Sequence, residues 1–309
     1  MKTNKFLIGF LLQATVCSSG LHAQTDLYAN AYSIIQDAVT DIVCTSPTDA
    51  IQKEKRVIQI LDGKGKGDAS FVCMCDRFSS LKKFSGEVRD ASGNVIRKIK
   101  KSELKVTEYS DELVSDDYYY FFEYTPSQYP ITITYEWEIK NSDGLIGYPS
   151  FLPQKNYNQS VAQASYRILT PADNPCRYRT INMQAEVSQK QTADGNWLTE
   201  VKVQSLPAIQ KEPYSPALSE LLPRIYFTPR NFSFEGTIGS MDNWQTYGAW
   251  QYQLLSGRDQ IPPALKEELQ RRTANCNTPY EKIAAVYQYL ASTTRYVSIQ
   301  LGIGGLQPI

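Results

Sequence analysis

Residues 131–140 read I-T-I-T-Y-E-W-E-I-K, and this stretch decides the fold class by its strict period of two. The odd positions, from Ile131 to Ile139, are aliphatic or aromatic, whereas the even positions are threonine, glutamate or lysine. One apolar side at this period is typical of a half-buried antiparallel strand. The sequence N-S-D-G at 141–144 then closes the strand with a turn.

Strand-type segments of similar length surround this stretch on both sides. Turn clusters rich in Gly, Asp and Asn separate several of them, for example at 90–94 and 194–196. The chain holds 21 tyrosines and only 4 methionines, a bias that suits pleated, half-buried surfaces. We therefore predict a mainly β protein with an antiparallel β-sandwich-like N-terminal region. The other expected strands cover residues 56–61, 69–77, 82–89, 95–100, 117–124, 160–169, 180–189 and 197–206.

Helical patterns replace the strand patterns after about Gly236. Asp242 is a suitable N-cap for a first helix, and Pro262 with Pro263 opens a second. A third begins at T-P-Y-E, 278–281, which has the T-x-x-E spacing of a capping box. Its apolar residues recur at helical spacing, and a strand at 295–301 is expected to follow. That apolar stripe comprises Ile283, Val286, Tyr287 and Leu290.

The first 23 residues have the pattern of a secretory signal peptide. Two lysines precede a short apolar run, and Ala23 offers a small residue for cleavage. A lipid anchor at Cys17 is the alternative, although the bulky Val16 before it disfavours that site. No later stretch is long and apolar enough for a transmembrane span. We therefore expect an exported protein of the periplasm or cell envelope, with a β-rich domain at 24–235 and a helical region at 236–309.

The charge balance excludes nucleic acid as a partner. The chain has 32 basic and 32 acidic residues, and removal of Lys2 and Lys5 with the signal leaves 30 against 32. A duplex binder needs clustered Lys and Arg. The nearest basic run, R-K-I-K-K at 97–101, alternates as the solvated face of a strand does.

Two further motifs have structural interpretations. The run D-G-K-G-K-G at 62–67 lacks the order of a phosphate-binding loop, and we predict a hairpin turn there. The mature chain carries five cysteines, an odd number, so one or two disulfides and buried, unpaired thiols remain alternatives. Metal binding at Cys73-Met74-Cys75 would need more ligands, and we favour a packing role for most of the thiols. The cysteines are Cys44, Cys73, Cys75, Cys176 and Cys276.

The single histidine, His22, falls inside the signal segment. A mature chain without imidazole lacks the usual base that activates a serine or cysteine nucleophile. Carboxylate catalysis would need two acids facing one cleft. The adjacent pairs at 116–117 and 267–268 are better interpreted as solvated surface. We therefore predict no catalytic, cofactor-binding or metal-binding residue, and no cofactor.

The segment Y-E-K-I-A-A-V-Y-Q-Y-L-A-S-T-T-R-Y-V-S-I-Q-L-G-I-G-G-L-Q-P at 280–308 resembles the start of bacterial transglutaminase-like domains, an α+β, papain-like fold. In that family a G-D-C-K-type motif with the nucleophilic cysteine, and then its His and Asp partners, follow such a segment. This chain has none of the three, and Cys276 lies upstream, outside any G-D-C context. The resemblance implies that Arg295 and Tyr296 are candidate cleft-shaping residues, and strand packing is the alternative.

Three earlier segments resemble the family called domain of unknown function 3857. They are D-A-S-G-N-V-I-R-K-I at 90–99, Y-P-I-T-I-T-Y-E-W-E-I at 129–139 and G-Y-P-S-F-L-P-Q at 147–154. The family commonly lies between a signal peptide and a transglutaminase-like domain in Gram-negative envelope proteins. The resemblance therefore implies a β-sandwich of no known activity.

These observations leave three functional hypotheses. The first is a non-catalytic exported β module joined to an incomplete transglutaminase-like domain, whose full-length relatives would be thiol-dependent acyl transferases or peptidases. The second is a binding module without enzymatic role, in which aromatics such as Tyr118–Tyr120 contact a glycan, a peptide or another envelope protein. The third, a carboxylate-based hydrolase, has the weakest support.

Overall fold

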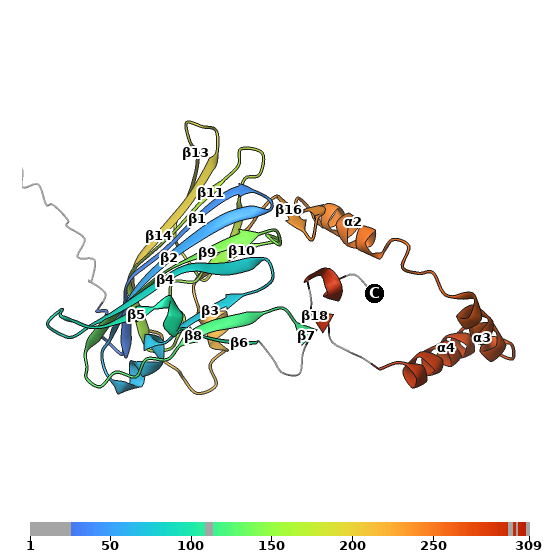
Figure 1. Cartoon of the computed structure of the whole chain (residues 1–309), viewed down its shortest axis with the longest axis horizontal. Coiled ribbons are helices and arrows are strands. Elements are labelled where there is room, and N and C mark those ends of the chain that lie inside the picture. Colours follow the sequence, from blue (N-terminus) through green and yellow to red (C-terminus); the bar gives the residue numbers. More distant parts are fainter. Residues whose placement is uncertain (1–25, 109–113, 296–298, 301, 307–309) are drawn as a thin grey trace, which may run out of the picture.

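The computed structural model describes residues 26–108, 114–295, 299–300 and 302–306 (Figure 1). The predicted signal peptide therefore lies outside the described residues. Strands dominate up to residue 240, and helices follow, so the mainly β fold class is confirmed. None of the described helices combines the length and apolar character that a bilayer-spanning segment needs.

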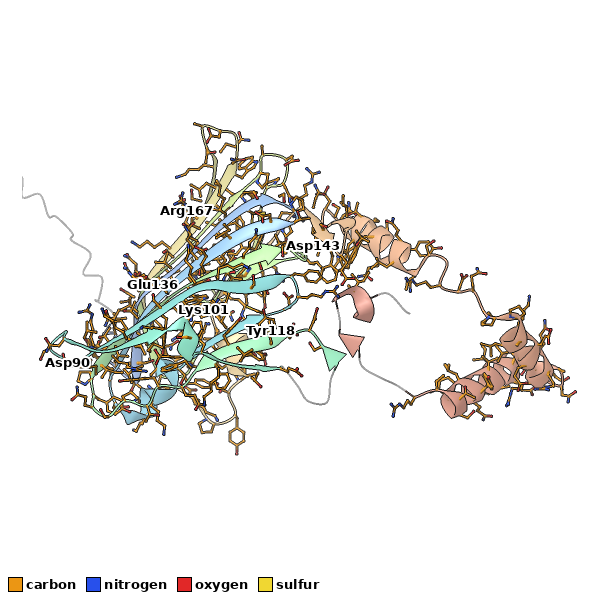
Figure 2. All side chains as sticks on the ribbon, viewed as in Figure 1. Asp90, Lys101, Tyr118, Glu136, Asp143 and Arg167 are labelled. Atoms are coloured by element: carbon orange, nitrogen blue, oxygen red, sulfur yellow. The ribbon has the colours of Figure 1, made fainter. Side chains whose placement is uncertain are left out.

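One eight-stranded sheet forms the main layer of the molecule. Strands β1 and β11 pair in parallel, and every other pairing in this sheet is antiparallel. Glu136 and Arg167, labelled in Figure 2, lie on two of its strands. In spatial order the strands are β13 (Val187–Gln191), β14 (Trp197–Leu206), β11 (Gln159–Thr170), β1 (Ser33–Ser46), β2 (Asp49–Ile60), β9 (Ile131–Ser142), β4 (Ser79–Arg89) and β5 (Val95–Lys100).

The stretch at 131–140 forms most of β9, as predicted. Ile131, Ile133, Tyr135 and Ile139 are buried, while Glu136 and Lys140 are exposed. Strand β9 lies between β2 and β4, so both of its edges are paired. The alternation therefore separates an inner, apolar face of the large sheet from an outer, solvated face.

Two three-stranded sheets cover the inner face. One is β10 (Tyr148–Phe151), β15 (Arg224–Thr228) and β12 (Arg177–Ile181), and the other is β3 (Phe71–Cys75), β8 (Tyr118–Phe122) and β6 (Lys105–Glu108). Tyr166 of the large sheet stacks on Phe227 of the first, with ring centroids 4.2 Å apart. Phe71 of the second packs on Trp137 at 5.2 Å. These aromatic contacts join the layers into one core.

The prediction of a hairpin turn at 62–67 is wrong. Residues Gly63–Ala69 form a short 3-10 helix, η1, and its flanking strands β2 and β3 belong to different sheets. The Asp62 side chain accepts a hydrogen bond from the Lys64 amide at 2.7 Å and begins this turn. The segment therefore carries the chain from the large sheet to a covering sheet. Within it, Gly65 is buried against the backbone of Tyr32.

The single strand predicted at 180–189 is also wrong. The segment splits into the end of β12 in a covering sheet and the start of β13 in the large sheet. Asn182 between them has φ +49, a left-handed conformation that interrupts an extended strand. The predicted turn at 194–196 is confirmed, because Gly195 has φ +81 and Gln191 pairs with Trp197 across it.

A smaller unit follows the sheets. Strands β16 (Asn231–Phe234) and β17 (Thr237–Ser240) form a hairpin, and helix α2 (Trp244–Leu255) packs on it. Phe232, Trp250 and Leu254 are the buried centre of this second cluster. The predicted cap Asp242 is wrong, because its carboxylate pairs with Arg230 at 2.8 Å. Asn243 caps α2 instead and accepts from the Thr246 amide at 2.9 Å.

Helices α3 (Pro263–Thr273) and α4 (Pro279–Thr293) pack on each other and stand apart from the sheets in Figure 1. The predicted capping box of α4 is confirmed, since Thr278 accepts from the Glu281 amide at 3.2 Å. The apolar stripe of α4 is exposed. Of the strand predicted at 295–301, the described part is β18 (Ile299–Gln300), which pairs with β7 (Val114–Ser115). The remaining short elements are η2 (Lys101–Glu103), α1 (Leu218–Leu221) and η3 (Gly302–Gly305).

Candidate functional site

The inner face of β2 carries a row of polar side chains inside the apolar core. Gln52, Glu54 and Arg56 occupy the inward positions between Ala50 and Ile58, because successive inward residues are two apart. Cross-strand pairing places Thr40 of β1 and Trp137 of β9 on either side of Glu54. Charged groups buried in this way need partners.

The Glu54 carboxylate is held by neutral donors. The Thr40 hydroxyl lies 3.0 and 2.9 Å from its two oxygens, and Gln52 Nε2 donates to Oε1 at 2.8 Å. Burial raises the pKa of the Glu54 carboxyl, whereas the nearby Arg56 opposes the rise. The two charged groups do not form a direct ion pair within 4.0 Å.

The Arg56 guanidinium is the least satisfied group of this row. It lies over the Trp137 ring at 5.9 Å from the centroid, a cation–π contact. Its Nε is buried and has no hydrogen-bond partner in the described part of the chain. Burial lowers the pKa of Arg56, but a guanidinium stays protonated in proteins. A charged donor is therefore held in place without an acceptor for Nε.

Arg56 borders a cavity of about 200 Å³, which we call the Arg56 pocket. Its floor comes from β1, β2 and β9, one wall from η1 and the start of β3, and the other from residues 155–156 after β10. Lys155 is solvent-exposed over much of its surface, yet desolvation of its ammonium and the neighbouring Arg56 lower its pKa to about 8. The pocket thus holds two cations beside the aromatic rings of Phe71, Tyr135 and Trp137.

Asp68 organises the rim of the Arg56 pocket. Its carboxylate accepts hydrogen bonds from the Ser33 hydroxyl, from Asn156 Nδ2 and, at 3.0 Å, from Gln159 Nε2. Gln159 Oε1 in turn accepts from the Lys155 amide at 2.9 Å. Neutral donors therefore satisfy Asp68, and the same network fixes the backbone that carries Lys155.

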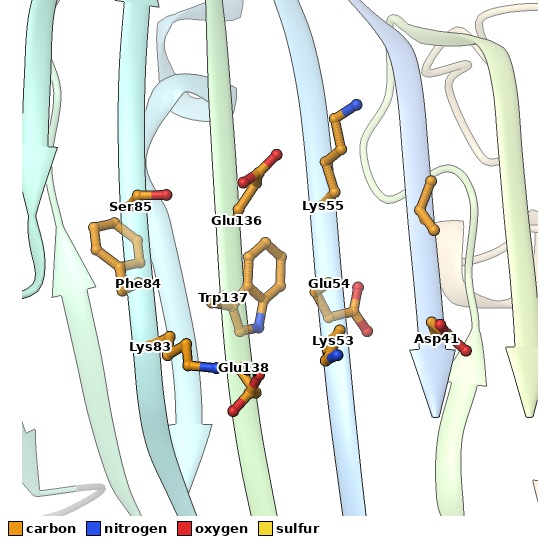
Figure 3. A pocket seen from close by; sticks show the side chains of 11 residues that line it. Asp41, Lys53, Glu54, Lys55, Lys83, Phe84, Ser85, Glu136, Trp137 and Glu138 are labelled. Atoms are coloured by element: carbon orange, nitrogen blue, oxygen red, sulfur yellow. Dashed lines mark hydrogen bonds and ion pairs between the residues drawn. The ribbon is translucent and has the colours of Figure 1, made fainter. Parts of the chain in front are cut away.

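A larger hollow lies on the outer face of the large sheet and is shown in Figure 3. Its volume is about 420 Å³, and charged side chains from β1, β2, β4 and β9 line it. Lys83 points toward Glu138 on the neighbouring strand and pairs with it at 3.0 Å, while Lys55 pairs with Asp37 at 3.3 Å. These two exposed pairs occupy three of the charged side chains that line the hollow, and most of the others lie on the solvated face, where charge–charge contacts are weak. The hollow therefore offers a ligand less than the Arg56 pocket does.

The residues singled out from the sequence lie elsewhere. Arg295 is exposed two residues after the end of α4, and Tyr296 lies outside the described residues. Of the acidic pairs, Asp116 lies 3.8 Å from Arg77, and Glu268 pairs with Arg272. Neither pair contributes to the Arg56 pocket.

The five cysteines among the described residues are unpaired. Four are buried and Cys276 is half-buried. Burial raises the pKa of Cys44 and raises that of Cys176 to about 12, which opposes thiolate formation. Within the described ranges, no group of three or more His, Cys, Asp or Glu side chains is arranged to hold a metal ion.

Sequence reasoning missed Arg56 and Lys155. One signal was available, since Gln52, Glu54 and Arg56 share the phase of Ala50, Ile58 and Ile60, which are buried. A charged residue in phase with an apolar face marks an unusual position. Lys155 carried no such signal, because it lies in a loop between strands and only the packing of the layers brings it to Arg56.

Comparisons with known proteins concern the fold and the family. The family model described as "Domain of Unknown Function with solved-structure structure (DUF3857)" matches residues 50–210. No curated protein matches the chain.

A likeness to a solved structure bears on the fold. A crystal structure from Parabacteroides distasonis, described as a "putative protease", aligns with a TM-score of 0.63 at 12% identity, over 84% of this chain and 50% of that one. An M1 zinc metallopeptidase from Deinococcus radiodurans aligns at 0.30 with 8% identity, over 79% and 53%, a score too low to bear on the fold. The first likeness supports the layered β fold, and the chain spans about half the length of these proteins.

Proposed function

Because the chain belongs to the DUF3857 family, whose model covers residues 50–210, we propose that it is a non-catalytic β module that binds a peptide at the Arg56 pocket. We further propose that it is exported to the cell envelope. In longer relatives it would accompany a transglutaminase-like, thiol-dependent acyl transferase or peptidase. The 23-residue N-terminal pattern and the resemblance at 280–308 motivate these two parts.

One observation carries the binding role. The Arg56 side chain lines an open cavity with aromatic walls, and its guanidinium forms no hydrogen bond or ion pair with a described residue. A partly desolvated cation without a counter-ion is less stable than a paired one. A ligand that brings an anionic or carbonyl group into the cavity supplies that partner, so the arrangement favours binding.

The same site is poorly equipped for catalysis. Glu54 is already engaged by Thr40 and Gln52, and Asp68 by its three donors. No imidazole follows His22 in the sequence. A nucleophile with an adjacent base is the usual requirement for acyl transfer. We therefore assign the chemistry of the longer relatives to a different segment from this β module.

A peptide fits the site better than a neutral glycan. Sugar recognition commonly uses exposed aromatic faces for stacking. The aromatic run on β8, the best candidate for such a platform, is half-buried, and Tyr118 and Tyr120 pack against the core with their rings 5.6 Å apart. Charged donors in a small recess suit the charged or amide groups of a peptide.

Binding measurements with the purified chain test the proposal. We expect a mixed-sequence peptide pool to bind with 1:1 stoichiometry in titration calorimetry, and a mixture of neutral oligosaccharides to give no heat. Thiol-dependent hydrolysis or transamidation of the same peptides should be absent. Glycan binding without peptide binding, or thiol-dependent turnover by this chain, would refute the proposed function.

Export is tested separately. We expect the protein in the periplasmic or envelope fraction of the producing cell, with a mature N-terminus at Gln24. Recovery of the uncleaved chain from the cytoplasm would contradict this part of the proposal and leave the binding role unaffected.

A further inference from the structure

We propose that the Arg56 pocket recognises the C-terminal carboxylate of its peptide, with Arg56 and Lys155 as the two cationic contacts. The inference rests on the peptide-binding function proposed above and specifies the end of the peptide that enters. It follows from the donor geometry, the charge balance, the size of the cavity and the position of β3.

The donor geometry suits a carboxylate. A guanidinium presents its N–H groups in a rigid planar fork, which matches two carboxylate oxygens in a bidentate pair. The Nε of Arg56 is enclosed by protein atoms, whereas the two terminal nitrogens are accessible and form no hydrogen bond with a described residue. Two parallel hydrogen bonds from these terminal nitrogens would hold the two carboxylate oxygens. The ring of Trp137 on the guanidinium face leaves the edge as the direction of approach.

The charge balance also favours an anion. Glu54 and Asp68 are the acidic groups nearest to the cations, and each already accepts hydrogen bonds from neutral side chains. Neither forms an ion pair with Arg56 or Lys155 within 4.0 Å. The charge of Arg56 helps to lower the pKa of Lys155, and Glu54 only partly offsets this effect. A carboxylate between them would relieve this repulsion.

The size of the cavity suits one terminal residue. Its volume of about 200 Å³ is below the roughly 300–1,000 Å³ of pockets for drug-sized ligands. Ile35, Ile58 and Phe71 give it an apolar lining beside the cations. The carboxylate would therefore lie on Arg56 while the last side chain contacts these apolar residues, and the rest of the peptide leaves through the mouth.

Strand β3 is positioned to hold the preceding residues. It is the edge strand of the sheet β3-β8-β6, and its first residues, Phe71 and Val72, line the pocket. An unpaired strand edge can add an extended peptide through main-chain hydrogen bonds. The exposed Val72 and Met74 side chains along this edge are available to contact such a strand. A free small acid would share the carboxylate contact but not this one.

Three probes test the assignment on the full chain. They are a mixed-sequence pool of N-acetylated tripeptides with free C-terminal carboxylates, the same pool as C-terminal amides, and N-acetylalanine as a free small acid. We expect the acid pool to bind at least about tenfold more tightly than the amide pool, because a charge-assisted pair is lost in the amide. The NMR resonance of Arg56 Nε–H should shift with the acid pool alone.

Variants connect the effect to the two cations. Arg56→Met and Lys155→Met should each remove most of the preference for acid over amide, whereas Arg167→Gln on the outer face should keep it. If Arg56→Met fails to fold, the Nε–H resonance of the unchanged protein and the exposed Lys155→Met variant still decide the result.

The outcomes distinguish a failure of the carboxylate assignment from a failure of the proposed peptide binding. Equal binding of the acid and amide pools would overturn the carboxylate assignment and leave peptide binding intact. Binding of N-acetylalanine as tight as that of the acid pool would support the carboxylate contact but overturn the peptide as its source. Failure of both pools to bind would remove the proposed function and this inference together.

Discussion

Gly65 shows how one residue allows the chain to cross between layers. A Cβ added at this position would lie 2.3 Å from the carbonyl oxygen of Tyr32. That oxygen accepts a hydrogen bond from the Leu61 amide at 3.0 Å, so it cannot move freely. The absence of a side chain therefore lets η1 lie against Tyr32, just before β1, with Asp68 at the rim of the Arg56 pocket.

We expect Gly65→Ala to lower the free energy of unfolding by about 1–3 kcal/mol, the usual cost of forcing extra volume into a packed site. Gly67→Ala in the same 3-10 helix is the matched control, because its Cβ would meet no atom within 4 Å. That control should stay within about 0.5 kcal/mol of the unchanged protein. Urea denaturation measures both, and equal effects would contradict the close approach at Gly65.

Glu54 should give the protein a specific pH dependence. Burial raises its pKa in the folded state, so the folded protein holds this proton above pH 4.5, where the unfolded chain releases it. This contribution to stability is complete below about pH 4.5 and is lost as the pH rises through the folded-state pKa. We expect the free energy of unfolding to fall less steeply over this window in Glu54→Gln than in the unchanged protein.

The measurement is urea unfolding at a series of pH values, and Glu136→Gln on the outer face is the control for simple loss of charge. Parallel pH profiles for Glu54→Gln and the unchanged protein would show that burial of Glu54 does not govern this dependence.

Among the elements, helix α2 begins after two neighbouring polar residues, of which one forms an ion pair and the other caps the helix. Asp242 and Asn243 are both good N-cap residues by type. Arg230 engages the carboxylate of Asp242, and the chain then turns so that Asn243 faces the first helical amides. A contact with Arg230, in the turn before β16, therefore accompanies the choice of Asn243 as the cap.

We expect Asn243→Ala to cost about 1 kcal/mol of stability and to reduce hydrogen-exchange protection of the Thr246 amide. Asp242→Ala should cost less and leave that amide protected, because it removes only an exposed ion pair. If only the Asp242 variant lost protection at the Thr246 amide, Asp242 and not Asn243 would be the N-cap of α2.

In the whole molecule, stacked aromatic rings hold the layers together. Tyr166 projects from the large sheet onto Phe227 of a covering sheet, with an interplanar angle of 3°. Both side chains are almost fully buried. The contact connects strands far apart in the sequence and fastens this covering sheet to the large sheet.

We expect Phe227→Ala to lower the free energy of unfolding by about 3–5 kcal/mol, because a buried ring and its stack are lost together. Tyr226→Ala is the matched control from the same strand. That ring is 40% exposed, and its removal should cost less than about 1 kcal/mol. Thermal or urea unfolding measures both, and similar losses would contradict the role of the stack.

The sequence alone determined the local features of this protein. The alternation at 131–140 gave the strand and its buried face, and the T-x-x-E spacing at Thr278 gave the cap of α4. Both depend on residues a few positions apart, so the chain itself contains the information. The strand-rich composition likewise indicated the fold class.

Only the tertiary structure decided how the layers meet and where the candidate site lies. The parallel pairing of β1 with β11, the crossing at 62–67 and the split of the segment at 180–189 depend on contacts between distant segments. Arg56 and Lys155 are 99 positions apart in the sequence, and an arginine or a lysine by itself does not indicate a binding pocket. A hydrogen-bond donor is left without an acceptor only when the surrounding layers have closed around it, so no local pattern could reveal that site.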